Sequence, residues 1–208
     1  MINHIKNAII KTPLLKPLAY VKTLVLTGRP PVTPPTQEQK KAVILEYAKR
    51  FGSKIFVETG THLGDMVENC KNFFDEVHSI ELSDDFYNKA KLRFAGDAHI
   101  NLYQGDSGLV IKDVVPLISK PVLFWLDAHY SGESTARGES DTPIVEELNY
   151  ILQHCKQPFC ILIDDARLFI GKNSYPRIKY LNNMISSTYP TLAMEVYGDI
   201  IRIYPKVI

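Results

Sequence analysis

The sequence lacks the features that mark disulfide-rich, zinc-binding or membrane-spanning proteins. Only three cysteines occur in 208 residues, Cys70, Cys155 and Cys160, and no CxxC pair is present, so neither a disulfide framework nor a zinc knuckle is indicated. No apolar run reaches the roughly 18 residues that a membrane span needs. The N-terminus also lacks the basic stretch, apolar core and small-residue cleavage site of a secretory signal. We therefore expect a cytoplasmic protein in a reducing compartment.

Acidic residues are absent from residues 1–37, although this segment carries five basic residues. Its charge is therefore +5, and because the whole chain has a net charge of +1, the remainder carries −4. Prolines crowd residues 30–35 and predict a stiff, extended linker. We assign residues 1–35 to a basic N-terminal extension with a Pro-rich linker, and residues 36–208 to one domain.

The basic extension is compatible with several roles. It could cover an active site, form a homodimer contact, lie on an anionic membrane as a peripheral anchor, or remain a solvated arm. Nucleic acid is not an expected partner, because the rest of the chain is acidic and its basic residues are not interleaved with stacking aromatics.

Short β-branched and aromatic runs alternate with helical spacings after residue 36, which is typical of a parallel sheet covered by helices. Helices are expected at 36–50, 64–73, 84–95, 107–118, 142–155 and near 175–187. Strands are expected at 54–58, 76–81, 100–104, 121–127 and 159–164. Two further strands, 192–197 and 200–204, are separated only by Gly198 and Asp199, so they must pair as an antiparallel hairpin.

The first predicted strand leads into a glycine-containing turn before a helix. The turn reads Glu58-Thr59-Gly60-Thr61-His62-Leu63-Gly64. Glycines let a backbone turn sharply and approach a ligand closely, and a helix N-terminus offers unpaired N–H groups. The alternative is a tight strand-to-helix corner with no ligand.

Polar side chains also close the second and third strands. Glu81 ends the second strand, where a carboxylate can accept hydrogen bonds from both hydroxyls of a ribose; the alternative is a solvated glutamate. Asp106 and Ser107 follow the third strand, at the same edge of the sheet. Their alternative role is to cap the helix that begins there.

These motifs, in this order, resemble those of the class I S-adenosylmethionine (SAM)-dependent methyltransferases over residues 40–204. The resemblance implies a Rossmann-like three-layer α/β sandwich with a mostly parallel seven-stranded sheet that ends in an antiparallel hairpin. It also implies a SAM site made by Glu58, Gly60, Thr61, His62 and Gly64 around the methionine, Glu81 at the ribose, and Asp106 with Ser107 at the adenine. His62 departs from the family pattern, which often has glycine there.

Three more aspartates close the fourth and fifth strands: Asp127, Asp164 and Asp165. Carboxylates held this close cannot all stay charged without a cation or a proton, and oxygen ligands suit Mg²⁺ or Ca²⁺. The pattern is similar to that of metal-dependent O-methyltransferases acting on catechols and on sugar hydroxyls of natural products, which implies Mg²⁺ at these aspartates. The alternative is that Asp127 only orients the amino group of the donor, while the Asp pair caps a turn.

His129 lies two residues after Asp127 and could act as a general base, a metal ligand or a substrate contact; the alternative is an ordinary polar contact in a loop. Residues 129–141 are expected to form an active-site loop. Arg137 or Arg167 could bind an anionic acceptor or form a surface ion pair.

The resulting hypothesis is O-methylation of a small hydroxylated acceptor, such as a glycosyl or polyol unit, with Asp127 and His129 as catalytic residues and with Mg²⁺ assistance. One alternative is an NAD-dependent oxidoreductase, although the turn lacks GxGxxG and the tail forms a hairpin. The other is a non-catalytic binding module with the same fold.

Overall fold

The structure is a computed structural model that describes residues 33–128 and 142–206, all but the first of which belong to the compact unit Pro34–Ile208. Its strands are β1 (Ile55–Thr59), β2 (Glu76–Glu81), β3 (Ile100–Gln104), β4 (Val122–Leu126), β5 (Phe159–Ile163), β6 (Leu192–Tyr197) and β7 (Ile200–Pro205). Its α-helices are α2 (Gln37–Phe51), α3 (Asp65–Cys70), α4 (Asp84–Arg93), α5 (Ser107–Val114), α6 (Ile144–His154) and α7 (Ile178–Thr188).

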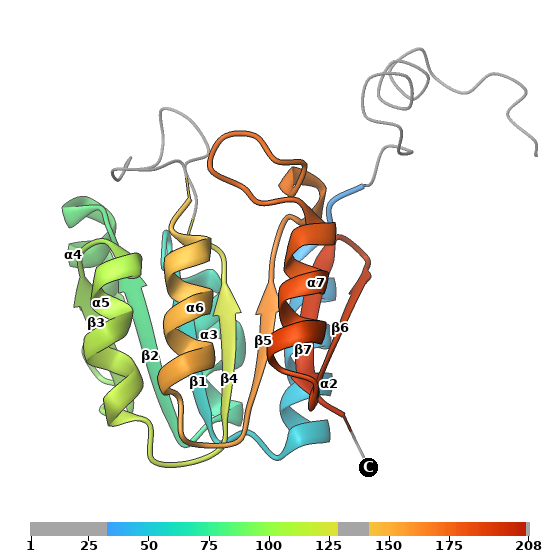
Figure 1. The fold of residues 1–208 in the computed structure, drawn as a ribbon. Helices are drawn as coiled ribbons and strands as arrows, with labels where there is room; N and C mark the ends of the chain where they lie inside the picture. The colour runs from blue at the N-terminus through green and yellow to red at the C-terminus, as the bar shows by residue number, and fades with distance from the viewer. Residues whose placement is uncertain (1–32, 129–141, 207–208) are drawn as a thin grey trace, which may run out of the picture. The chain divides into compact units, whose positions relative to one another are not determined.

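The seven strands form one sheet in the order β3-β2-β1-β4-β5-β7-β6. Strands β1 to β5 are parallel, whereas β7 pairs antiparallel with both β5 and β6 (Figure 1). The predicted fold class is therefore confirmed, including the closing hairpin. Strand order reverses between β1 and β4, and open α/β sheets bind their ligands outside the carboxyl ends of strands at such a point.

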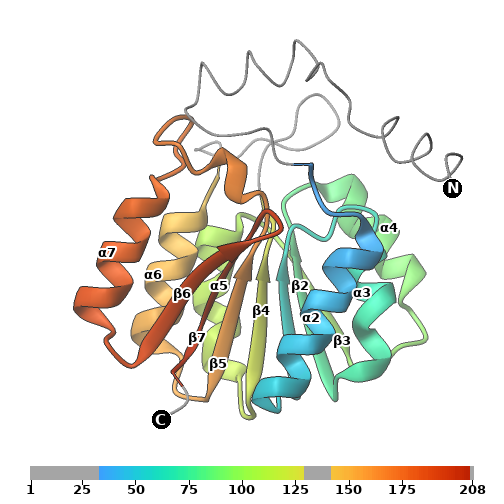
Figure 2. The same cartoon turned by 90° about the vertical axis from the view of Figure 1, so that its right-hand side faces the viewer.

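Helices cover both faces of the sheet and bury a separate apolar core on each. Helices α5, α6 and α7 pack on one face, while α2, α3 and α4 pack on the other (Figure 2). Residues of β1 and β4 alternate between these cores: Val57 and Phe124 belong to the first, Phe56 and Trp125 to the second. Burial on both faces explains why these strands are continuous apolar runs in the sequence.

Local signals set the bounds of helix α2. Thr36 and Gln39 form a capping box, with the Gln39 N–H donating to Thr36 Oγ1 and the Thr36 N–H donating to Gln39 Oε1. Gly52 ends the helix in a left-handed conformation at φ +65°, as expected for glycine at this position. In the part of the chain that the structure describes, no helix is long and apolar enough to cross a membrane.

Three expected helices differ from the observed ones. The helix expected at 64–73 becomes α3 followed by a 3-10 turn at Lys71–Phe73. The helix expected at 107–118 becomes α5 followed by a 3-10 turn at Val115–Leu117, because Pro116 has no N–H for an α-helical bond. Helix α7 starts at Ile178 rather than near residue 175, because Pro176 disfavours helical backbone at the residue before it. Tyr175 is instead buried in the preceding loop.

Candidate active site

The carboxyl ends of the central parallel strands meet at one edge of the sheet. Thr59 at the end of β1 pairs with Ile80 of β2 and with Leu126 of β4, and Leu126 pairs in turn with Ile163 of β5. The polar residues at these strand ends therefore gather along this edge, as the sequence predicts. They are Glu58, Glu81, Asp106, Asp127, Asp164 and Asp165.

The glycine turn after β1 lies directly against the end of β4. Gly60 has φ +87°, and a Cβ atom placed on it would lie 2.8 Å from the backbone oxygen of Asp127. His62 also has a left-handed conformation, at φ +49°, so this histidine follows the backbone path that favours glycine. Gly64, at φ +78°, then begins α3. A side chain at position 60 would push the two loops apart.

Glu58 is buried inside the turn that it precedes. Its Oε2 lies 2.6 Å from the hydroxyl oxygen of Ser79, and that hydroxyl lies 2.6 Å from Thr61 Oγ1. Burial raises the pKa of the Glu58 carboxyl well above its usual range, with the Ser79 hydrogen bond opposing the rise. This chain of hydroxyls links β1, β2 and the glycine turn from within.

The Glu81 side chain holds the backbone of the same turn by hydrogen bonds. Its two carboxylate oxygens accept the N–H of His62 at 2.6 Å and the N–H of Ser83 at 2.8 Å. The His62 ring packs against Phe86, with 4.5 Å between ring centroids. A carboxylate can accept about four hydrogen bonds, so Glu81 keeps capacity for the hydroxyls of a ribose.

Asp106 and Ser107 begin helix α5. The Asp106 side chain caps this helix by accepting the Gly108 N–H at 2.9 Å, so the capping role considered from the sequence is present. Ser107 is buried behind it. Capping and contact with an adenine are compatible, because the second carboxylate oxygen of Asp106 is not used in this bond.

Glu147 is a buried acid that the sequence reasoning missed. It lies on α6 with no exposed surface, and burial raises its pKa to about 7. The hydroxyls of Ser107 and Thr59 offset part of this rise, but among the described residues neither makes a hydrogen bond of ordinary geometry to its carboxylate oxygens. Its signal in the sequence is an acid on the apolar face of a helix, next to Leu148 and one turn from Ile144.

Each aspartate after β5 pairs with a cation. Lys40 of α2 forms an ion pair with Asp164, whose other oxygen accepts the Asp165 N–H at 2.8 Å. Asp165 has φ +56° and pairs with Arg167 at 2.6 Å, and Arg167 also pairs with Asp199. The ion-pair alternative for Arg167 is therefore the arrangement observed.

Charges at this edge shift one another's pKa values. Burial and the nearby Asp127 raise the pKa of Asp164 to about 7, although Lys40 opposes the rise. Burial lowers the pKa of Lys40, but Asp127 and Asp164 outweigh it and leave that pKa above its usual value. Lys40 is thus held as an ammonium ion beside Asp164 and under the influence of Asp127.

The three aspartates predicted to bind Mg²⁺ do not fit that ion as they are arranged. Lys40 already pairs with Asp164, and Arg167 draws Asp165 towards Asp199. Within residues 33–128 and 142–206, no group of three histidine, cysteine, aspartate or glutamate side chains could hold a metal ion. A divalent ion here would have to displace the lysine.

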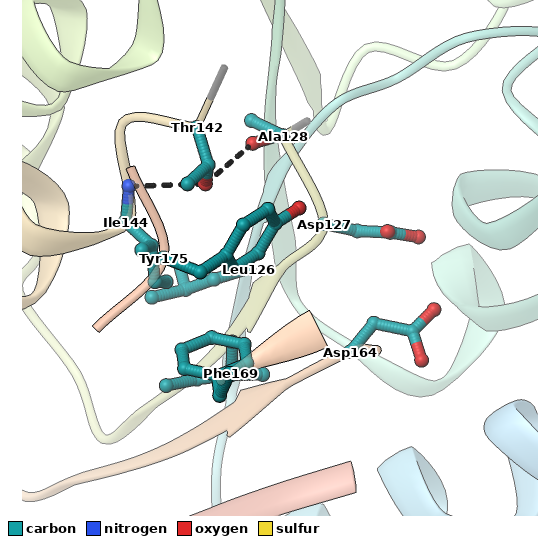
Figure 3. Close-up of a pocket in the computed structure, with 9 residues that line it drawn as sticks. Leu126, Asp127, Ala128, Thr142, Ile144, Asp164, Phe169 and Tyr175 are labelled. Atoms are coloured by element: carbon teal, nitrogen blue, oxygen red, sulfur yellow. Dashed lines mark hydrogen bonds between the residues drawn. The ribbon is translucent and has the colours of Figure 1, made fainter. Parts of the chain in front are cut away.

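A small, shallow hollow opens between the ends of β4 and β5 (Figure 3). Its apolar floor includes Phe169 and Ile163, while Asp127, Asp164 and Tyr175 supply polar groups. The Asp127 and Asp164 side chains project in the same direction, away from Phe169. Carboxylates thus line one side of the hollow, and apolar and aromatic side chains line the other.

Thr142 closes one side of this hollow. Its hydroxyl donates to the backbone oxygen of Ala128 at 3.3 Å and accepts the Ile144 N–H at the same distance. The predicted catalytic residue His129, the candidate anion-binding Arg137 and the loop 129–141 lie outside the described residues, as does most of the extension 1–35.

No protein-family model matches the sequence, and neither does any curated protein. Solved structures do match the fold. The O-methyltransferase of Bacillus cereus in complex with S-adenosylhomocysteine (SAH) superposes with a TM-score of 0.60 at 11% identity, over 97% of each chain. The O-methyltransferase TomG of Streptomyces achromogenes, involved in tomaymycin synthesis and solved with SAM, gives 0.57 at 13% identity, over 93% of this chain and 92% of its own.

A third likeness is to an enzyme named for a different acceptor. The 23S rRNA methyltransferase ErmE matches with a TM-score of 0.57 at 13% identity, over 84% of this chain and 70% of its own. At such identities the likeness concerns the fold, and the acceptors named for these proteins differ. The chain therefore has the Rossmann-like fold of the class I SAM-dependent methyltransferases.

Proposed function

We propose that this protein is a SAM-dependent methyltransferase that transfers a methyl group to a hydroxyl oxygen of a small acceptor, such as a glycosyl or polyol unit. The observation that carries the proposal is the set of acids that close successive parallel strands beside a glycine turn pressed against β4.

The donor site is proposed to run along the ends of β1, β2 and β3. Glu58, Gly60, Thr61, His62 and Gly64 would enclose the methionine part, with Asp127 opposite. Glu81 would accept the ribose hydroxyls through lone pairs that the His62 and Ser83 N–H groups do not use. Asp106 and Ser107 would contact the adenine.

The acceptor is proposed to bind at the hollow between β4 and β5. When bound, the donor supplies a methyl group activated by a sulfonium, so the protein needs chiefly to align the acceptor oxygen and exclude water. Such alignment can provide roughly 7 to 11 kcal/mol of the barrier. His129 would take the hydroxyl proton and Asp127 would orient the reacting groups. The proposed reaction uses no Mg²⁺, because Asp164 already pairs with Lys40 and Asp165 with Arg167.

Donor binding is the first test. We expect SAH to raise the thermal unfolding temperature of the wild-type protein, because a ligand that binds only the folded state stabilises it. Glu81→Gln should lose most of this shift, whereas Asp84→Asn, a control on the exposed first turn of α4, should keep it. Stabilisation by NADH but not by SAH would instead indicate an oxidoreductase, and no response to either would favour a non-catalytic module.

Methyl transfer is the second test. A panel of glycosides, polyols and catechols can be incubated with labelled SAM and scored for labelled product. Once an acceptor is found, Asp127→Asn and His129→Gln should each reduce kcat. If both variants turn over at the wild-type rate, the assigned catalytic residues are wrong even if SAM binds.

A further inference from the structure

A lysine lies where the sequence pattern of aspartates predicts a divalent ion. Lys40 belongs to α2, which packs on one face of the sheet, while Phe169 and Tyr175 of the hollow belong to the core on the other face. Its side chain is 14% exposed and that of its partner Asp164 only 1% exposed. An ion pair this protected from water is screened much less than a surface pair.

The position of Lys40 is fixed by its helix. The capping box at Thr36 sets where α2 begins, and the Lys40 N–H donates to the Thr36 backbone oxygen at 2.9 Å. Helix α2 packs on β4 and β5, and Lys40 Nζ lies 5.9 Å from the centre of the Trp125 ring. The ammonium group therefore has little freedom to leave the strand ends.

Acidic side chains at this edge of the sheet form ion pairs with nearby basic side chains. Arg167 pairs with Asp165 and Asp199, and Lys40 pairs with Asp164. The charge of Asp127 also acts on the Lys40 ammonium and raises its pKa. A divalent ion beside the same two carboxylates would meet a positive charge at short range, which strongly disfavours its binding.

We propose that Lys40 is the resident cation of this site: its ammonium replaces a divalent ion beside Asp127 and Asp164, and fixes the Asp164 carboxylate next to the hollow where the acceptor binds. Lys40 is thus a positioning residue that acts through Asp164. Its role at the hollow rests on the proposed methyl transfer, but the replacement of a metal ion does not.

Mn²⁺ binding, followed by electron paramagnetic resonance on the full chain after chelator treatment, tests the replacement directly. The variants are Lys40→Met, Lys40→Arg and, as a control on the exposed side of α2, Lys49→Met. Lys40→Met should bind Mn²⁺ at least about tenfold more tightly than wild type, because it leaves the buried Asp164 carboxylate without its ion-pair partner. Adding Asp164→Asn to Lys40→Met should abolish the gained binding. Lys40→Arg and Lys49→Met should behave like wild type.

Two outcomes overturn the proposal. One is tight Mn²⁺ binding by wild type that Asp164→Asn removes, since the metal would then displace the lysine. The other is a folded Lys40→Met protein that gains no Mn²⁺ binding. If Lys40→Met does not fold, Mn²⁺ binding by wild type is compared with binding by Asp164→Asn. Equal binding by these two proteins supports the proposal, because Asp164 then holds no Mn²⁺.

Measurements of turnover and of SAH affinity distinguish a failure of this inference from a failure of the proposed function. In an active enzyme, Lys40→Met should lower kcat while SAH affinity stays unchanged, Lys40→Arg should restore much of the rate, and chelation should leave the wild-type rate intact. A protein that neither binds SAH nor methylates any acceptor would refute the proposed function but would leave the Mn²⁺ result interpretable.

Discussion

Replacing Glu147 by glutamine should change how the stability of the protein depends on pH. Glu147 is fully buried on α6, and its carboxylate lacks a hydrogen-bond partner of ordinary geometry among the described residues. Its pKa rises from 4.5 to about 7 because burial disfavours the charged form. Glutamine has nearly the same shape but cannot ionise, so the substitution removes the proton equilibrium and little else.

The sign and size follow from proton linkage. The folded state holds the Glu147 proton more tightly than the unfolded state, so this group's contribution to stability is fully present below pH 4.5 and is lost as pH rises through about 7. The full difference between 4.5 and about 7 corresponds to about 3 kcal/mol, of which about 2 to 3 kcal/mol is lost between about pH 5 and 8. The stability of Glu147→Gln relative to wild type should therefore rise by that amount over this interval.

Urea unfolding at several pH values between about 5 and 8 measures the effect. The comparison of variant with wild type cancels the titration of other buried acids, including Glu58 and Asp164, which both proteins share. It also cancels the roughly constant cost of burying an amide, about 1 to 3 kcal/mol. Glu146→Gln is the matched control, because its neighbouring carboxyl is exposed and the variant should follow the wild-type curve. Parallel curves for wild type and Glu147→Gln would refute the reasoning and would mean that the carboxylate is well solvated or paired.

Three further predictions concern the backbone near the site. Gly60→Ala should abolish SAH-induced thermal stabilisation, because its Cβ would lie 2.8 Å from the Asp127 oxygen; retained stabilisation would contradict the close packing of these loops. His62→Val should lower the free energy of unfolding by about 1 to 2 kcal/mol more than His62→Gly, since φ is +49° there, and equal urea midpoints would argue against a left-handed residue. Thr36→Ala should cost about 1 kcal/mol and Thr36→Ser much less, as measured by urea unfolding; no loss in either would exclude the capping box.

The fold was predictable because its signals are local and repeated. Continuous apolar runs indicated buried parallel strands, and the two-residue connection at Gly198 and Asp199 indicated the hairpin, where both residues have positive φ. The errors lie at helix ends: the helix expected at 64–73 ends at Cys70, and in two other helices a proline outweighed the helical pattern. Pro116 shortened one expected helix, and Pro176 delayed the start of α7.

The candidate site was only partly predictable. The acids at the strand ends could be located from the sequence, because parallel strands place their carboxyl ends at one edge. Their partners could not: Lys40 and Asp164 are separated by 124 positions, and only the packing of α2 on the sheet brings them together. Glu147 carried a signal that the helical spacing alone could have revealed, because it is an acid on the apolar face of α6.

The packing of α2 on the sheet also decides whether a metal ion or a lysine lies beside these aspartates. Carboxylates at neighbouring strand ends need a compensating positive charge, and a proton, a divalent ion or a side chain can each supply it. The aspartates alone do not decide among these, because their spacing is identical in all three cases. Helix α2 selects the side chain, since its start at Thr36 places Lys40 beside Asp164. The carboxylate of Asp165, whose backbone is left-handed, pairs with Arg167 instead. An aspartate pair after a strand therefore indicates a metal only where no helix delivers a cation to the same edge.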